Sequence, residues 1–402
     1  MNRKVVILSV MLFFLYLGDG ILSDWVPSFI QGSTKSSITM GLIISFSSVV
    51  GFLADLVFPG LLKKLKTKKL MLMAIGTSLL FCGILLWMIA WPILLLFLFS
   101  MAVWGLYYEF LGFGSQQFVS ESVPLQSRSG VWAIMGVFRS LAYFLGPIIG
   151  SYVALSIGNS ETVWVAVASV IVGLLIWLSW GKRNTNYATE ITKERFSIWQ
   201  EVKRWKTLSV HVWPILVISV VMGIVDATFW TTGTVLSDSM ARDNWLGGMF
   251  LPAYMLPMVF VGIIVAKWGI YRGKKKIAET FMLVAGLLLA ALSFNDSSYF
   301  MLLVSLLSGA ALSIAWPMTE AVYSDITERM GYEGKHMMGL SSSTLSLAYI
   351  IGPVMAGGIA QLVGERLTFS VMGILMALVA LILLIVTPRK LRLPQSEIQA
   401  WD

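Results

Sequence analysis

Long apolar runs constrain this chain more than any other feature of its sequence. Each run is about 20 residues long, which is enough for a helix to cross a ~30 Å hydrocarbon layer. The runs are apolar on all sides, whereas the strands of a membrane β-barrel alternate apolar and polar residues. Only 12% of the residues are charged, compared with about a quarter in soluble proteins. We therefore predict an all-α membrane protein.

Twelve such runs occur, and we expect each to form one transmembrane helix. The first run follows a charged start, but it is too long for a signal peptide and contains Asp19 and Asp24, so we interpret it as a retained helix. The expected spans are Val5–Ile30, Ile38–Leu62, Leu70–Ala90, Pro92–Phe118, Gly130–Ser156, Thr162–Trp180, His211–Leu236, Trp245–Ile270, Ile277–Phe294, Tyr299–Tyr323, Met337–Val363 and Leu367–Thr387.

The positions of Lys and Arg predict the orientation of these helices. With the N-terminus inside, 25 of the 29 basic residues fall in cytoplasmic segments and three fall in outer loops. Cytoplasmic loops carry such an excess in membrane proteins. We expect a multi-pass protein with cytoplasmic termini in the plasma membrane, or in the bacterial inner membrane if the source is prokaryotic. The net charge of +8 is then a topology signal and a contact with lipid headgroups, and nucleic-acid binding is not expected.

An eight-residue sequence occurs twice, half a chain length apart. Ser140–Pro147 reads Ser-Leu-Ala-Tyr-Phe-Leu-Gly-Pro, and Ser346–Pro353 reads Ser-Leu-Ala-Tyr-Ile-Ile-Gly-Pro, an offset of 206 residues. Duplication of one membrane-embedded unit is the simplest cause. The repeat predicts two pseudo-symmetric six-helix bundles, residues 1–181 and 209–402, joined by a cytoplasmic linker, residues 182–208.

The linker has two interpretations. Its segment Glu194–Lys206 has an amphipathic pattern, which fits a helix lying on the inner membrane surface. A solvated linker with an aromatic anchor fits equally well.

We single out six ionisable residues within the predicted spans, where charges are costly and tend to be functional. They are Asp19, Asp24, Glu109, Arg139, Asp226 and Glu320. Two pairs of acids follow the repeat, because Asp226 follows Asp19 by 207 residues and Glu320 follows Glu109 by 211. A helical rise of ~1.5 Å per residue places Asp19 and Asp226 near the membrane midplane, where transporter sites usually lie.

The whole chain resembles the major facilitator superfamily of secondary transporters, because it has two sets of six spans, a charged central loop and repeated halves. Gly51-Phe-Leu-Ala-Asp55 is similar to the family's gating motif after the second helix, although the basic residues Lys63 and Lys64 arrive later than usual. The resemblance implies that Asp55 helps to hold the inner side closed. A plain surface acid is the alternative.

A second motif resembles the fifth helix of the family's 12-helix drug/proton antiporters, Gly-x-x-x-Gly-Pro-x-x-Gly-Gly. Here the stretch from Ala142 reads Ala-Tyr-Phe-Leu-Gly146-Pro147-Ile-Ile-Gly150-Ser, with small residues substituted at two places. Small residues allow two helices to approach closely, and Pro bends the axis. Helix packing alone is the alternative to a role in antiport. The fourth helix departs from the antiporter pattern, because it carries Glu109 and lacks the usual Arg.

The resemblance also assigns roles to the ionisable residues. Helices one, four, seven and ten line the central cavity in this family, and all five acids lie on these helices. We expect Asp19, Glu109 and Arg139 to couple transport to protons, or Arg139 and Glu109 to form a fixed buried pair. The expected substrate cavity contains Asp24, Tyr107, Tyr108, Asp226, Trp230, Trp316 and Glu320. Alternatively, Asp226 and Glu320 lie in water and bond the hydroxyls of nearby threonines, and the aromatic residues are packing or interface anchors. These threonines are Thr228, Thr231, Thr232 and Thr319.

These observations favour a secondary active transporter that works by alternating access. The expected activity is proton-coupled efflux of hydrophobic or cationic small molecules. The alternative is proton-linked or facilitative transport of a polar solute, such as a sugar or metabolite, or of a lipid. No nucleophile, zinc or phosphate-loop motif occurs in the sequence, so we expect no enzyme activity, no cofactor and no metal. The expected partners are the substrate, protons and membrane lipid, and the expected state is a monomer.

Overall fold

The part of the chain that the computed structural model describes is built from helices and turns, without a strand. It comprises residues 3–61, 65–123, 128–179, 198–268, 273–388 and 393. Contacts within the chain divide it into two compact units, Met1–Arg195 and Phe196–Asp402. The predicted all-α class is confirmed.

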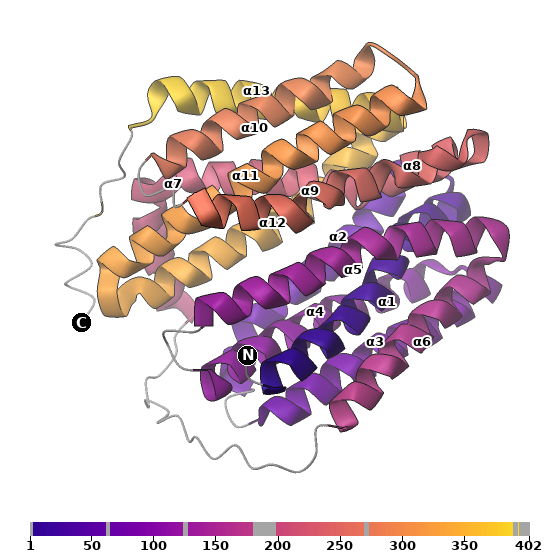
Figure 1. Cartoon of the computed structure of the whole chain (residues 1–402), viewed down its shortest axis with the longest axis horizontal. Coiled ribbons are helices and arrows are strands. Elements are labelled where there is room, and N and C mark those ends of the chain that lie inside the picture. The colour runs from indigo at the N-terminus through magenta and orange to yellow at the C-terminus, as the bar shows by residue number, and fades with distance from the viewer. Residues whose placement is uncertain are drawn as a thin grey trace. The chain divides into compact units, whose positions relative to one another are not determined.

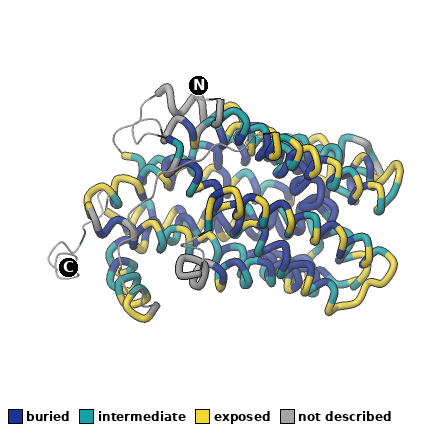
Figure 2. The backbone as a smooth tube through the Cα atoms, turned by 90° about the horizontal axis from the view of Figure 1, so that it is seen from below, coloured by how far each residue is buried: buried dark blue, intermediate teal, exposed yellow. Residues whose placement is uncertain are grey.

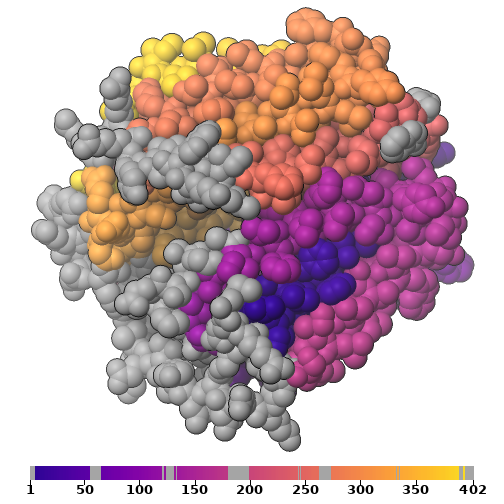
Figure 3. All heavy atoms as spheres, in the orientation of Figure 1, coloured from indigo at the N-terminus to yellow at the C-terminus, as the bar shows by residue number. Residues whose placement is uncertain are grey.

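The described residues of the first unit form six long helices. These are α1 (Arg3–Thr34), α2 (Ser37–Leu61), α3 (Thr67–Ala90), α4 (Leu94–Ser122), α5 (Arg128–Ser156) and α6 (Asn159–Leu178). Helix α1 packs against α5 and α6, and α4 packs against α2 and α3 (Figure 1). Figure 3 shows the indigo atoms of α1 flanked by the purple and magenta atoms of α5 and α6. Helix α1 is therefore an inner element of this unit.

The second unit repeats this packing. Its helices are α7 (Ile198–Phe229), α8 (Thr232–Asp243), α9 (Phe250–Trp268), α10 (Lys274–Ala290), α11 (Ser298–Met330), α12 (Gly334–Val363) and α13 (Glu365–Val386), with short 3-10 turns η2 (Trp245–Met249), η3 (Ala291–Ser293) and η4 (Gly331–Glu333). Helix α7 packs against α12 and α13, and α11 packs against α9 and α10. The pairs α1–α5 and α4–α2 thus correspond to α7–α12 and α11–α9, as the duplicated sequence predicts.

The helices have the length and surface of membrane spans. Eleven segments of the described residues are long and apolar enough to cross a membrane, and a shorter apolar segment, Leu246–Val261, covers much of α9. Together they account for the twelve predicted spans. Large apolar side chains such as Leu362 and Ile385 are exposed, at 85% and 75%. Buried and exposed positions alternate along the helices (Figure 2), as expected where one side of a helix faces its bundle and the other faces lipid.

Helix α7 differs from the predicted span His211–Leu236 at both ends. It begins at Ile198, so residues 198–206 form its first turns and continue directly into the span. It ends at Phe229, and α8 begins at Thr232. The hydroxyls of Thr228 and Thr231 donate to carbonyls four residues earlier, which is a local bond that bends helices. The break therefore follows the threonine-rich sequence, which the hydropathy pattern did not reveal.

Small residues let the first and fifth helices of each unit touch. A Cβ atom on Gly146 would lie 2.7 Å from the carbonyl carbon of Gly20, and one on Gly352 would lie 2.7 Å from the Cβ of Ala227. Gly146 and Gly352 occupy the same position of the eight-residue repeat. The repeated Gly-Pro segment is therefore a point of close helix contact in both units.

Candidate functional site

The carboxylate of Asp19 lies at the centre of an aromatic cluster in the first unit. Its Oδ1 accepts a hydrogen bond from Trp104 Nε1 at 2.8 Å. Its Oδ2 accepts from the hydroxyls of Tyr108, at 2.8 Å, and Tyr143, at 2.7 Å. Asp19 is 4% exposed. Helix α1 thus supplies the acid, and α4 and α5 supply the donors.

Stacked rings hold these donors in place. The ring of Phe81 on α3 stacks on Trp104 with centroids 5.1 Å apart and planes at 10°. Trp104 in turn contacts Tyr108, with centroids 5.8 Å apart. The ring centroids of Tyr16 and Tyr143 are 5.6 Å apart. The cluster therefore joins four helices around one carboxylate, and we call Asp19, Trp104, Tyr108 and Tyr143 the first acid cage.

Asp226 has a related environment in the second unit. Its Oδ1 accepts a hydrogen bond from the hydroxyl of Tyr254 on α9 at 2.6 Å. Its Oδ2 accepts a short hydrogen bond from the hydroxyl of Tyr349 on α12. The ring of Tyr254 stacks on Phe229 with centroids 3.8 Å apart and planes at 7°. We call Asp226, Tyr254 and Tyr349 the second acid cage.

Each cage contains a tyrosine at the same position of the sequence repeat, and the sequence analysis did not assign a role to either one. Tyr143 and Tyr349 are the fourth residues of the two eight-residue repeats, 206 positions apart. Each donates to the acid of its own unit, and those acids are 207 positions apart. The matching offsets of acid and tyrosine were the available signal. The threonine alternative for Asp226 is wrong for Thr228 and Thr231, whose hydroxyls bond backbone carbonyls.

Asp24 is held by the fifth-helix motif. Its Oδ2 accepts from the hydroxyl of Ser151 at 2.9 Å, and a Cβ atom on Gly150 would lie 3.2 Å from the same oxygen. Asp24 is 1% exposed. Ala142, Gly146 and Pro147 are likewise buried on α5. The motif therefore packs α5 against α1 and binds an acid of α1 at the same time.

Glu109 meets the gating motif instead of the acid cage. A Cβ atom on Gly51 of α2 would lie 3.0 Å from Glu109 Oε1, so the carboxylate rests on the glycine. Arg139 is exposed on α5 and is not among the donors to Asp19 within the described residues. The rest of the gating motif cannot be placed, because the side chain of Asp55 and the residues Lys63 and Lys64 lie outside the described part of the chain.

The remaining predicted cavity residues differ in exposure. Tyr107 is buried, and its hydroxyl faces the carbonyl of Leu15 at 3.5 Å. Tyr108 is 36% exposed, which opens one edge of the first acid cage. Trp230 and Trp316 are partly buried, and Glu320 is exposed on α11. The hydroxyl of Thr319 donates to the carbonyl of Ala315, which removes it as a donor to Glu320.

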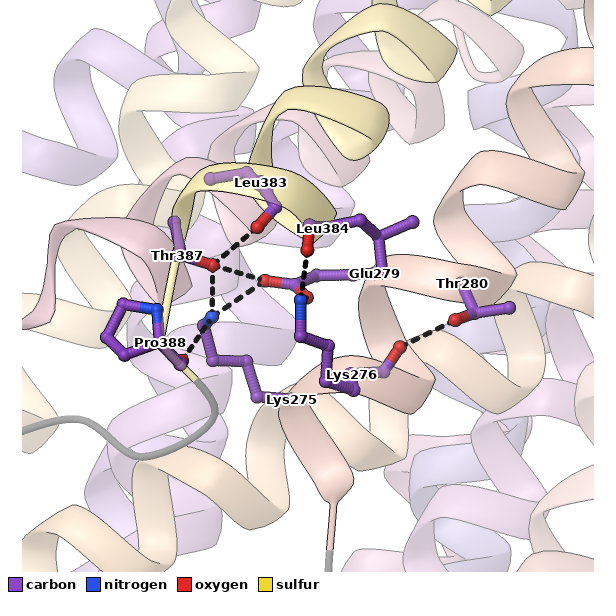
Figure 4. A network of polar contacts seen from close by, with 8 residues as sticks. All are labelled: Lys275, Lys276, Glu279, Thr280, Leu383, Leu384, Thr387 and Pro388. Carbon is purple, nitrogen blue, oxygen red and sulfur yellow. Dashed lines mark hydrogen bonds and ion pairs between the residues drawn. The ribbon is translucent and has the colours of Figure 1, made fainter.

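One intramembrane acid escaped the sequence analysis. Glu279 lies in the predicted span Ile277–Phe294, is fully buried and forms an ion pair with Lys275 at 2.8 Å. Lys275 also donates to Thr387 and to the carbonyl of Pro388, which ties the start of α10 to the end of α13 (Figure 4). The sequence analysis counts the lysines at the start of α10 among the cytoplasmic basic residues and assigns them no acidic partner. This network shares no residue with either cage, and it connects α10 to the residues that follow α13.

The geometry of the first acid cage sets what a proton would do there. An ionised carboxylate only accepts hydrogen bonds, and Trp104 Nε1 only donates. These three donors use three of the four lone-pair positions of the carboxylate, so a proton can add to the free position on Oδ1, and it removes the charge that strengthens all three hydrogen bonds. Each such bond to an ionised group contributes about 1.5–3 kcal/mol. Proton binding at Asp19 therefore disturbs the contact of α1 with α4 or α5. Within the described residues, no group of three or more His, Cys, Asp or Glu is arranged to hold a metal.

The chain matches the family model described as Major Facilitator Superfamily over residues 8–272 and again over residues 230–401. No curated protein sequence matches it. Similar solved structures include a human organic anion transporter, MFSD10 (TETRAN), with 17% identity, a TM-score of 0.67 and coverage of 95% of this chain and 99% of that one. Nucleoside transporter NupG has 11% identity and a TM-score of 0.72, and the match covers 95% of this chain and 98% of that one. A POT family transporter in complex with a thioalcohol-conjugated peptide has 12% identity and a TM-score of 0.74, and the match covers 96% of each chain. At these identities the solved structures share its fold.

Proposed function

The chain belongs to the Major Facilitator Superfamily and is a multi-pass transporter, and from this premise we propose that it exports hydrophobic or cationic small molecules in exchange for protons. The observation that carries the proposal is the first acid cage. It combines a buried carboxylate with the indole of Trp104 and the phenol of Tyr108, and Tyr108 is 36% exposed. Aromatic faces and a carboxylate are the groups that attract an organic cation. The substrates of the similar structures differ among themselves, so the substrate class rests on this chemistry alone.

Protons and cations compete for the same carboxylate in this proposal. A proton on Asp19 neutralises the charge that attracts the substrate and weakens the hydrogen bonds from the three aromatic donors. Release of the proton restores both the charge and the contact between α1 and α5. A transporter that alternates between these states exchanges one cation for protons. Asp226, with two phenol donors, offers a second acidic position for the substrate.

Glu109 and Arg139 complete the proposed coupling. Glu109 rests on Gly51, so a change in its charge acts directly on the start of the gating motif. Arg139 is exposed on α5, the helix that carries Tyr143, and is placed to respond when α5 moves. Approach of Arg139 to an acid would favour its ionised form, and withdrawal would favour proton uptake.

Transport in proteoliposomes tests this function. Vesicles containing the purified protein and tetraphenylphosphonium are given a pH gradient, and loss of the cation is followed with an ion-selective electrode. We expect gradient-driven loss from wild-type vesicles and from the control D296N, whose acid is 83% exposed. We expect no gradient-driven loss with D19N. Undiminished gradient-driven transport by D19N would remove Asp19 from the coupling.

A polar solute is the second candidate, and the phenol hydroxyls favour it. Tyr108, Tyr143, Tyr254 and Tyr349 place four hydroxyls on two carboxylates. A sugar or metabolite with several hydroxyls can replace such donors one for one. Uptake of labelled sugars or nucleosides by the same vesicles, with no movement of tetraphenylphosphonium, would select this candidate.

The proposal includes the orientation and assembly of the protein. We propose that both termini are cytoplasmic, in the plasma membrane or bacterial inner membrane, and that the protein acts as a monomer surrounded by lipid. The 25 basic residues of the predicted inner segments support this orientation. Reporter fusions at each terminus, active only in the cytoplasm, test the topology. Light scattering of the protein in detergent tests the mass against 44.4 kDa.

A further inference from the structure

A histidine with three charged neighbours joins two helix starts in the second unit. His336 lies in the first turn of α12, and its Nδ1 is 2.8 and 2.7 Å from the two carboxylate oxygens of Glu201 on α7. Its Nε2 is 2.8 Å from Arg204 Nη1, also on α7, and 2.9 Å from Glu333 Oε2 at the end of η4. His336 is 5% exposed and Glu333 is 6% exposed. The imidazole is therefore enclosed by two carboxylates and one guanidinium.

The two neighbours of Nε2 make opposite demands on it. A guanidinium only donates, so Nε2 can accept from Arg204 only when it carries no hydrogen. A carboxylate only accepts, so Nε2 can bond Glu333 only when it carries one. Within the described residues, Glu333 Oε2 has no hydrogen bond of good geometry, although it lies within ion-pair distance of Nε2. The heavy-atom geometry thus fits a neutral imidazole, with Nδ1–H on Glu201 and Nε2 accepting from Arg204.

We propose that His336 is a proton-binding site, separate from the acid cages, that exchanges Arg204 for Glu333 when it is occupied. The proton comes from the aqueous phase and adds to the Nε2 lone pair. Nε2–H then donates to Glu333, and Arg204 leaves Nε2. The bond from Nδ1–H to Glu201 persists in both states. Among the described residues, the charged groups that contact the ring are Glu201 and Arg204 from α7 and Glu333 from η4.

The position of the site gives the exchange a mechanical consequence. Helices α7 and α12 are packing partners, and α7 also carries Asp226 while α12 also carries Tyr349. A neutral His336 links the start of α12 to α7 through two bonds, to Glu201 and to Arg204. A protonated His336 keeps only the bond to Glu201, because its bond to Glu333, three residues earlier, stays at the start of α12 itself; the link between α12 and α7 is therefore weaker. Imidazole is the side chain whose charge ordinarily changes at physiological pH. The site can therefore report pH to the α7–α12 pair.

The small number of histidines makes the proposal directly measurable. The chain contains two, His211 and His336, so protein labelled with ¹⁵N-histidine in lipid nanodiscs gives two sets of ring signals. The variant H211Q identifies the His336 set. We expect His336 to be an Nδ1–H tautomer at pH 8.5 and to gain a second N–H as the pH is lowered to 5. A His336 that keeps one protonation state over this range would overturn the proposal.

Two variants separate the roles of the neighbours. At an intermediate pH, E333Q removes the negative charge that favours the protonated form, and we expect the ratio of protonated to neutral His336 to fall about tenfold. R204Q removes the donor to the neutral form, and we expect the same ratio to rise about tenfold. The control D325N alters an exposed acid of α11 and leaves the ratio unchanged. Thermal unfolding checks that each variant is folded. Equal ratios in wild type, E333Q and R204Q would refute the exchange, whatever the protein transports.

Discussion

Tyr143 on α5 donates a hydrogen bond to Oδ2 of Asp19 on α1 over 2.7 Å, and so links residues that are 124 positions apart. The same bond joins Tyr349 to Asp226 in the second unit. The duplicated sequence therefore preserves a polar contact between the first and fifth helices as well as a packing contact. This contact gives the repeat a chemical role, because it brings a donor to the intramembrane acid of each unit.

The tyrosine hydroxyls are expected to stabilise both units. Y143F and Y349F each remove one donor to a carboxylate, and we expect each to lower the free energy of unfolding by about 1.5–3 kcal/mol. Y143F should also alter the pH dependence of transport, because Asp19 then loses one of three donors. Thermal unfolding and transport at several pH values measure the two effects. Y152F is the control, since Tyr152 is 67% exposed on α5. Equal behaviour of Y143F and Y152F would contradict the role of Tyr143.

Much of the fold was predictable because lipid imposes simple rules. Apolar runs of the length of a bilayer and the octapeptide repeat together predicted the helices and their duplication. The acids Asp19 and Asp226 were predictable for a related reason. A charge in an apolar run is costly, so it stands out in the sequence. Their matching position in the two halves then marked them as a pair.

The partners of these acids were harder to predict. Tyr and Trp are common in membrane helices as interface anchors, so Tyr143 and Tyr349 carried no signal of their own. Glu279 was missed because it follows three lysines and resembles the polar edge of a loop. The end of α7 at Phe229 depends on hydroxyl bonds of Thr228 and Thr231, which hydropathy does not describe. Each of these features depends on side-chain geometry across helices or on local backbone bonding.

The two caged acids should respond differently to neutralisation. D19N is expected to abolish the effect of a pH gradient on tetraphenylphosphonium transport and also to weaken binding of the cation, because the proposal has proton and cation compete for this carboxylate. D226N should retain the gradient effect and bind the cation more weakly, because the second acidic position is lost. Counterflow measurements and calorimetric titration separate these outcomes. Identical losses in both variants would show that the acids act as one group.

Two glycines lie where a helix of each unit crosses another at close range, α4 over α2 and α11 over α9, and we expect neither position to tolerate a side chain. A Cβ atom on Gly105 of α4 would lie 2.2 Å from the carbonyl oxygen of Ser47, and one on Gly309 of α11 would lie 2.3 Å from that of Tyr254. We expect G105A and G309A each to cost about 1–3 kcal/mol, because the helices must separate. G112A is the matched control on α4, where a Cβ atom would meet nothing within 4 Å. Thermal unfolding in one detergent compares all three, and equal stability of G105A and G112A would contradict the close crossing.

The buried charges at the start of α10 should matter as a pair. E279Q leaves Lys275 buried with only Thr387 and the carbonyl of Pro388, and we expect a loss of about 3–5 kcal/mol. K275M should cost less, because Lys276 also lies 3.4 Å from Glu279 and can take over the charge. The double variant K275M/E279L should be more stable than E279Q, since it leaves no unpaired charge at position 275.

Lys274 provides the control for this pair, because it forms its ion pair with Asp325, whose side chain is 52% exposed. K274M should change stability by less than about 1 kcal/mol. All four variants are compared by thermal unfolding at one pH and one salt concentration. If E279Q lost no more stability than K274M, the ion pair of Lys275 and Glu279 would contribute no more than an exposed pair does. Apolar packing would then account for the stability of the contact between α10 and α13.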